Sequence, residues 1–174
     1  ASRGAEISII EIGGTVGDIE SQPYLETIRQ MRYELGSANV LCVHLTLVPY
    51  LASAKELKTK PTQHSVKELR SMGIQPDILL CRAEREIPRH VLDKIALLCS
   101  VGAENVFELQ DVDSIYKVPL VLSRQGVDKA IVKSFSLEAG APCLKEWEEI
   151  ASRLDHPKRQ VKIGIVGKYT GVAD

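Results

Sequence analysis

The chain has 174 residues, with 22 lysines and arginines against 23 aspartates and glutamates, a formal net charge of −1, and a hydrophobic content of 44%. This composition excludes a disordered chain, and because a balanced charge creates no extended positive field, it argues against general binding to nucleic acid or to an anionic membrane. Without a run of about 18 apolar residues or a secretion leader, the expected protein is globular and cytoplasmic, with no membrane span.

The first part of the chain is predicted to form a strand, a turn and a helix. Residues 6–12 are an apolar run of strand length, and the glycines after them permit backbone conformations that other residues resist. A helix is predicted from Ser21, as N-cap, to Gly36, because apolar residues recur at helical spacing between them. Together these elements predict one strand and crossover helix of a parallel sheet.

A second strand is predicted at residues 39–48, and His44 within it is expected to be a core histidine with satisfied polar atoms. A polar loop of about fourteen residues then leads to a shorter helix that ends at Gly73. Loops of this length in compact domains are commonly functional, and this one carries the lysines Lys55, Lys58 and Lys60.

The alternation continues to the end of the chain. Strands are predicted at residues 77–81 and 105–109, with a helix from Pro88 between them and two short helices after Pro119. A helix is predicted from Pro142, and Trp147 on it is expected to be a core anchor. A polar linker follows, and residues 161–166 are the last predicted strand. The pattern predicts an α/β fold with a mostly parallel sheet and crossover helices, and a further domain that continues beyond Asp174.

Ligands of open parallel sheets bind at the carboxyl ends of the strands, so the residues after each predicted strand are the candidate site. These are Glu11 and residues 13–20, residues 58–63, Arg82, and residues 110–112. We expect their charged and polar side chains to converge on one edge of the sheet.

Each of these groups has a functional and a purely structural interpretation. Glu11 at a strand exit suits a magnesium ion, or else it is a carboxylate turned to solvent. The run KTKPTQ, residues 58–63, places two ammonium groups before a helix N-terminus, which suits a triphosphate, or else it is a solvated basic loop. In the same run Thr62 is a candidate helix cap, and Gln63 can offer a donor and an acceptor to a nucleobase. Lys94 has no local feature that distinguishes it from a surface lysine.

Five segments resemble the CTP synthase family: EIGGTVGDIES, HLTLVPY, KTKPTQHSVKELRSMGIQPDILLCR, QDVDSIYKVP and VGKYTGVAD. The likeness runs from about Ala5 to Asp174. It implies the later part of a P-loop amidoligase (synthetase) domain of dethiobiotin synthetase-like type, incomplete at its N-terminus, over residues 1–140. It further implies a helical linker over residues 141–160 and the first strand of a class I glutamine amidotransferase domain over residues 161–174.

The resemblance also implies an activity. In this family ATP phosphorylates the 4-oxygen of UTP, and ammonia from glutamine then displaces phosphate to give CTP, in a reaction that needs Mg²⁺. CTP is a feedback inhibitor at a site that overlaps that of UTP, GTP is an allosteric activator, and the enzyme is a homotetramer. The site is contributed across a subunit interface.

Roles are implied residue by residue. Glu11 resembles the magnesium-binding glutamate, and no catalytic residue is implied within this sequence. The positions similar to those that bind UTP and CTP are Asp18, Ile19, Glu20, Lys58, Thr59, Lys60, Pro61, Thr62, Gln63 and Lys94. The positions similar to those near ATP are Arg82, Gln110, Asp111 and Val112.

Two parts of the family pattern are missing from the sequence. It contains no GxxxxGK[ST] phosphate loop, which should lie upstream, and no glutaminase Cys-His-Glu set, so we expect that this polypeptide alone does not make CTP. The alternative is a standalone nucleotide-binding or oligomer-assembly module without ligase activity. A related amidoligase with another substrate is disfavoured by the specificity of KTKPTQ.

Overall fold

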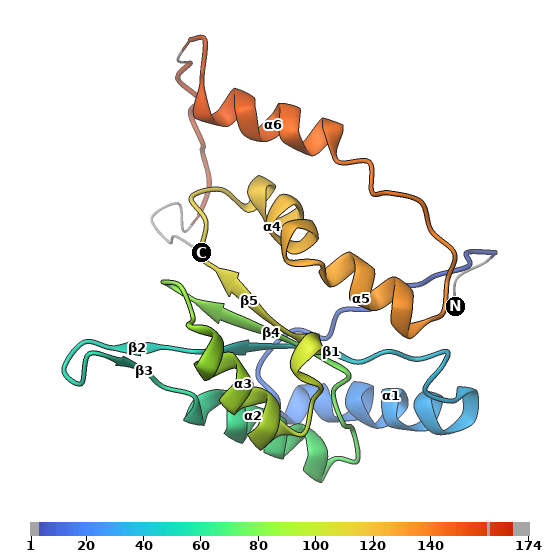
Figure 1. Ribbon diagram of the computed structural model, residues 1–174. Helices are drawn as coiled ribbons and strands as arrows, with labels where there is room; N and C mark the ends of the chain where they lie inside the picture. The colour runs from blue at the N-terminus through green and yellow to red at the C-terminus, as the bar shows by residue number, and fades with distance from the viewer. Residues whose placement is uncertain (1–3, 160, 169–174) are drawn as a thin grey trace.

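A computed structural model of the chain describes residues 4–159 and 161–168, and in it a parallel sheet lies between two helical layers (Figure 1). The sheet has three strands in the order β1 (Val43–Leu47), β4 (Ile78–Ala83) and β5 (Val106–Gln110). The helices below it in Figure 1 are α1 (Gln22–Leu35), α2 (Lys60–Ser71) and α3 (Arg89–Cys99). The helices above it are α4 (Val118–Gln125), α5 (Val127–Ser134) and, outermost, α6 (Lys145–Asp155). The predicted α/β fold is confirmed.

Three single turns of 3-10 helix complete the assignment. They are η1 (Ile19–Ser21), η2 (Ala103–Asn105) and η3 (Ile115–Lys117). None of the helices within the residues described is long and apolar enough to cross a membrane.

The central strand β4 shows why the sheet is covered on both faces. Leu79, Cys81 and Ala83 belong to the core between the sheet and the α2–α3 layer, whereas Ile78 and Leu80 pack with α4 and α5. Successive side chains of a strand point to opposite faces, so a run of apolar residues needs a helical layer on each side. The continuous run ILLC therefore specifies the middle strand of a two-sided sheet.

Helix α1 is attached to the start of the sheet by an ion pair. Arg32, in its last turn, donates to both carboxylate oxygens of Asp77 at 2.5 and 2.6 Å, and the backbone N–H of Cys42 donates to the same carboxylate at 2.8 Å. Leu25 of α1 packs with Leu69 of α2 in a second small core. One carboxylate thus joins a helix and the beginnings of two strands.

Two predicted strands are wrong in the structure. Residues 6–12 and residues 161–166 are extended but carry no strand assignment. A strand is stable only when a neighbour accepts its backbone hydrogen bonds, and within the part of the chain described neither segment has such a neighbour. Ile9 and Ile163 are accordingly 95% and 81% exposed. The remainder of the VGKYTGVAD segment, residues 169–174, lies outside the described residues.

The other differences concern the ends of elements and the long loop. The second predicted strand begins only at Val43, and the expected loop contains the hairpin β2 (Tyr50–Leu51) and β3 (Glu56–Leu57). Arg85 lies over the ring of Tyr50 at 3.5 Å, which is a cation–π contact that sequence spacing does not reveal. The hairpin shortens the free loop, with Lys55 in its turn and Lys58 directly after β3.

Two further predictions on helices need correction. Ser21 precedes α1 as expected, but its hydroxyl donates to the carbonyl oxygen of Asp18 at 2.8 Å and does not cap the helix, because η1 leads into α1. Trp147 is 37% exposed and lies against Tyr116, with ring centroids 6.4 Å apart, so it is not a core anchor. Helix α6, which carries Trp147, covers the periphery of the upper layer.

His44 is a satisfied core histidine, as predicted, and this has a consequence for stability. Its side chain is buried and its Nε2 lies 2.8 Å from the hydroxyl of Ser65 on α2. Burial lowers the pKa of His44 below its ordinary value of 6.5, so the unfolded chain binds that proton more readily than the folded one. The free energy of unfolding should therefore fall as the pH drops below about 6.5.

Urea unfolding between pH 7.5 and 5.5 measures this effect. H44Q should flatten the pH dependence, since glutamine retains a polar atom but does not titrate. H90Q, at an exposed position, is the matched control and should leave the dependence unchanged. An identical slope in H44Q and the unmodified chain would contradict the assignment.

Candidate functional site

The KTKPTQ segment is fastened directly to the carboxyl end of β1. Thr62, fully buried in the first turn of α2, donates to the carbonyl oxygen of Leu47 at 3.1 Å and lies 3.2 Å from the hydroxyl of Thr46. The backbone N–H of Lys58 donates to the carbonyl of Pro49 at 2.9 Å. The predicted cap role of Thr62 is wrong, because the helix begins at Lys60 and Thr62 points into the core.

The positive charge of this segment is presented outward. Lys60 and Pro61 are exposed, and the first turn of α2 holds no acidic residue that would neutralise the helix N-terminus. Gln63 donates its amide to the Thr59 hydroxyl at 2.9 Å, so one of its two functions is used within the helix. Free helix N–H groups beside ammonium groups give this end of α2 a local positive charge despite the balanced total charge.

Glu56 partly neutralises the positive charge around these lysines. Its carboxylate forms an ion pair with Lys58, and this hydrogen bond, with a smaller contribution from Lys94, holds the pKa of Glu56 below its ordinary value. Lys94 is exposed on α3, which packs against α2, the helix that carries Lys60. Glu56 was not predicted as a site residue, although an acidic residue two positions before Lys58 is visible in the sequence.

The charged residues at the carboxyl ends of β4 and β5 meet as predicted. Arg82 and Asp111 form an ion pair with Nε and Oδ1 2.6 Å apart, and the backbone N–H of Asp111 donates to the carbonyl of Ala83 at 2.9 Å. In the sheet Arg82 is in register with Leu47 of β1, so the three strand ends lie along one edge. Gln110 is exposed and Val112 half-buried beside this pair.

The loop after the first predicted strand lies elsewhere. Asp18 accepts a hydrogen bond from the backbone N–H of Thr15 at 2.7 Å, which closes the turn that begins at Gly14 with φ +83°. Gly17 approaches Glu68 of α2, so that a Cβ at residue 17 would lie 3.5 Å from its side chain. Because Glu68 follows Lys60 by about 12 Å of helix, Asp18, Ile19 and Glu20 are not brought directly onto the KTKPTQ segment. The expected convergence of all four groups is therefore only partial.

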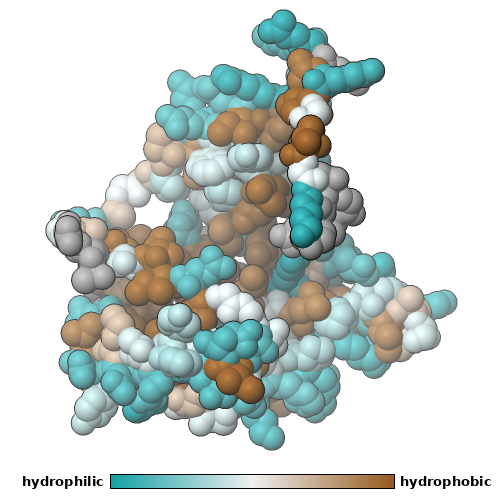
Figure 2. All heavy atoms as spheres, turned by 180° about the vertical axis from the view of Figure 1, so that it is seen from behind, coloured by the Kyte–Doolittle hydropathy of each residue, from teal (hydrophilic) through white to brown (hydrophobic). Residues whose placement is uncertain are grey.

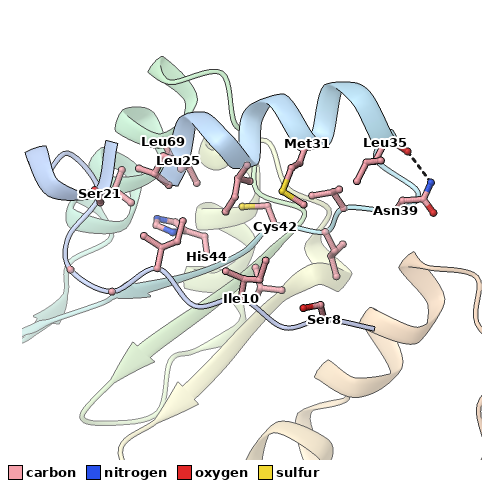
Figure 3. A pocket seen from close by; sticks show the side chains of 18 of the residues that line it. Ser8, Ile10, Ser21, Leu25, Met31, Leu35, Asn39, Cys42, His44 and Leu69 are labelled. Atoms are coloured by element: carbon pink, nitrogen blue, oxygen red, sulfur yellow. Dashed lines mark hydrogen bonds between the residues drawn. The ribbon is translucent and has the colours of Figure 1, made fainter. Parts of the chain in front are cut away.

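A hollow of about 430 Å³ separates residues 6–12 from β1 and α1. Figure 3 shows Ser8 and Ile10 on one side of it and Met31 and Cys42 on the other. Burial raises the pKa of the Cys42 thiol to about 11, so it is a neutral lining group and not a nucleophile. Seen from behind, apolar surface gathers in the hollowed middle of the molecule (Figure 2), and the edge strand β1 leaves Leu45 and Leu47 more than half exposed.

Glu11 lines an adjoining hollow of about 550 Å³, together with Glu20 and Tyr24. Its carboxylate is exposed, and no set of three or more possible metal ligands occurs in the described part of the chain. Magnesium is commonly held by one or two carboxylates with phosphate oxygens and water, so Glu11 is compatible with an Mg²⁺ ion that is also bound by a nucleotide.

Comparison with known proteins decides the family. Residues 1–137 match the family described as CTP synthase N-terminus. The chain belongs to the CTP synthase family. The CTP synthase of Hydrogenobaculum sp. (strain Y04AAS1) is 58% identical over 174 residues, covering 100% of this chain and 33% of that protein. Those of Koribacter versatilis and Synechococcus sp. (strain JA-3-3Ab) are 56% and 54% identical over 100% and 97% of this chain, each covering 31% of the relative.

The chain therefore spans about a third of the length of the CTP synthases that it matches. Within this third, the structure joins Lys58–Gln63 to the exit of β1 and Arg82 to Asp111 at the exits of β4 and β5. One charged cluster near this edge was missed from the sequence: Asp113, Lys117 and Asp155. The spacing of Asp113 and Lys117, four residues apart, was the available signal.

Proposed function

We propose that this chain supplies the nucleotide-binding edge of the ligase part of a CTP synthase, which converts UTP to CTP with ATP and with ammonia derived from glutamine. The observation that carries the proposal is the attachment of the KTKPTQ segment to the carboxyl end of β1. Buried Thr62 fixes the start of α2 on β1, and this places Lys58 and Lys60 beside an unneutralised helix N-terminus. Such a cluster suits the triphosphate of UTP or CTP.

The chemistry that these residues perform is positioning and charge neutralisation. Phosphoryl transfer to a nucleotide oxygen depends on holding the reactants in line and on compensating the charge of the phosphates. Lys58, Lys60 and Lys94 would hold and compensate the triphosphate of UTP, and the same contacts would admit CTP as a competing inhibitor. Magnesium, when bound with ATP, neutralises phosphate charge, and Glu11 would offer it one carboxylate oxygen.

The adenine nucleotide would lie at the exits of β4 and β5. The ion pair of Arg82 with Asp111 orders the loop there, and Gln110 and Val112 flank it. Asp18, Ile19 and Glu20 would contact the pyrimidine nucleotide from the loop against α2. Because this loop lies about 12 Å of helix from Lys60 within one chain, a site that uses both groups is favoured by assembly of several copies.

The wider setting belongs to the same proposal. We infer a homotetramer, activation by GTP, and a cytoplasmic location for the whole enzyme. Residues 1–140 would be synthetase domain, residues 141–160 a helical linker, and residues 161–174 the start of a glutamine amidotransferase domain. The position of α6 within residues 141–160 supports the linker. A standalone binding module is not favoured, because the match to CTP synthases covers the chain from end to end.

Calorimetric titration of the chain with nucleotides tests the proposal. We expect UTP and CTP to bind competitively in the presence of Mg²⁺ and uridine, which lacks the triphosphate, to bind far more weakly. Incubation with UTP, ATP and ammonia should give no CTP from this polypeptide alone. Equal affinity for uridine and UTP would contradict the triphosphate site, and appreciable CTP formation would contradict the expected dependence on residues outside this sequence.

A further inference from the structure

A lysine bridge outside the proposed nucleotide contacts joins two distant parts of the chain. The ammonium group of Lys117, at the end of η3, lies 3.0 Å from a carboxylate oxygen of Asp113 and 2.5 Å from one of Asp155. Asp113 directly follows the adenine-side positions, and Asp155 is the last residue of α6. The lysine side chain is only 22% exposed. It therefore connects the loop after β5 to the outermost helix.

We propose that Lys117 is a positioning residue that couples the packing of α6 to the conformation of residues 110–113. The loop is held on its sheet side by Asp111, which pairs with Arg82, and on its helical side by Asp113, which pairs with Lys117. Releasing Asp155 from Lys117 frees the end of α6 and withdraws one of the two partners that fix the lysine. The consequence for the adenine nucleotide rests on the function proposed above.

The shallow packing of α6 explains why one bridge matters. Ala151 is the buried residue of this helix, whereas Ile150 and Leu154 remain 36% and 47% exposed. It also contacts α4, and its Trp147 lies against Tyr116, which is the neighbour of Lys117 on η3. A helix with so little buried apolar surface opens at a low cost in free energy, and its open and closed positions are the two states that Lys117 couples to the loop.

The negative charges of Asp113 and Asp155 both stabilise the ammonium group of Lys117. Its two hydrogen bonds, first to Asp155 and then to Asp113, raise the pKa of Lys117. The same contact lowers the pKa of Asp113. Because Lys117 contacts both carboxylates, substitution of any one of the three residues changes the contacts of the other two. Exposed pairs are individually weak, so the expected effect is on coupling and not on global stability.

Four variants of the full chain test the coupling. K117M removes the charge, K117R retains it, and D155N weakens the bridge from outside the loop. R153M is the matched control, because Arg153 pairs with Glu149 on the exposed side of the same helix, 3.5 Å apart. The measurements are acrylamide quenching of Trp147, the only tryptophan in the chain, backbone hydrogen exchange of residues 110–113, and MgATP affinity.

For D155N and K117M we expect quenching of Trp147 to rise about twofold and exchange of residues 110–113 to rise about fivefold. K117R and R153M should leave both quenching and exchange as in the unmodified chain, and MgATP should bind D155N some threefold more weakly. The proposal would be overturned if D155N raises the quenching of Trp147 without faster exchange in residues 110–113. It would also be overturned if D155N leaves the quenching of Trp147 unchanged. Exchange and quenching decide the coupling whether or not the unmodified chain, which lacks the GxxxxGK[ST] loop, binds MgATP, whereas equal affinity for uridine and UTP counts against the proposed function.

Discussion

Replacing Lys58 and Lys60 together by methionine should weaken the binding of UTP about 100-fold and that of CTP by a similar factor. Each ammonium group is expected to make a charge-assisted contact to the triphosphate, worth about 1.5–3 kcal/mol, and each 1.4 kcal/mol corresponds to a factor of ten in affinity. Methionine keeps the length of the side chain. Both positions lie outside the core, so the fold should persist. Calorimetric titration with each nucleotide measures the loss.

The ion pair with Glu56 makes the two lysines unequal. K58M leaves the Glu56 carboxylate unpaired beside the incoming phosphates, so this single change should cost more affinity than K60M. E56Q, in contrast, should tighten UTP binding about threefold, because it frees Lys58 from an internal partner. K67M is the matched control, since Lys67 is exposed on the same helix away from its first turn. Equal losses in K67M and K60M would contradict a localised triphosphate site.

The features that the sequence predicted well are those determined by local pattern. The apolar run at β4 and the amphipathic spacing of α1 predicted their elements to within a few residues, because burial periodicity is a short-range property. That Arg82 and Asp111 lie at the same edge of the sheet followed from topology, since parallel strands end at a common edge, whereas their ion pair was not predicted. Sequence order and strand direction sufficed for these.

The features that it missed depend on long-range partners. Residues 6–12 have the composition of a strand, but pairing needs a neighbour, which a single segment does not contain. Thr62 has the residue type of a cap, yet its hydroxyl meets β1, 15 residues earlier in the chain. Lys117 reaches Asp155 across 38 residues. Residue type shows what a side chain can bond, whereas only the packed structure shows which partner it reaches.

A different kind of effect is expected from Asp77, which carries no proposed role in nucleotide binding. D77A should lower the free energy of unfolding by about 2–3 kcal/mol, because it leaves the partly buried guanidinium of Arg32 and the N–H of Cys42 without their acceptor. Its side chain is 25% exposed and that of Arg32 is 20% exposed, so solvent compensates only part of the loss. Urea unfolding at pH 7 measures the change.

Three variants distinguish the contribution of the ion pair to stability from the contributions of Arg32 and Asp77 taken singly. D93A removes the exposed i, i+4 partner of Arg89 and should cost less than about 0.5 kcal/mol. The double variant R32M/D77A should recover part of the stability lost in D77A, since it removes the uncompensated charge together with its acceptor. If D77A is as stable as D93A, the carboxylate does not join α1 to the sheet. If it is as unstable as we expect, α1 and the loop before it, which holds Asp18, depend on a residue far from both in the sequence.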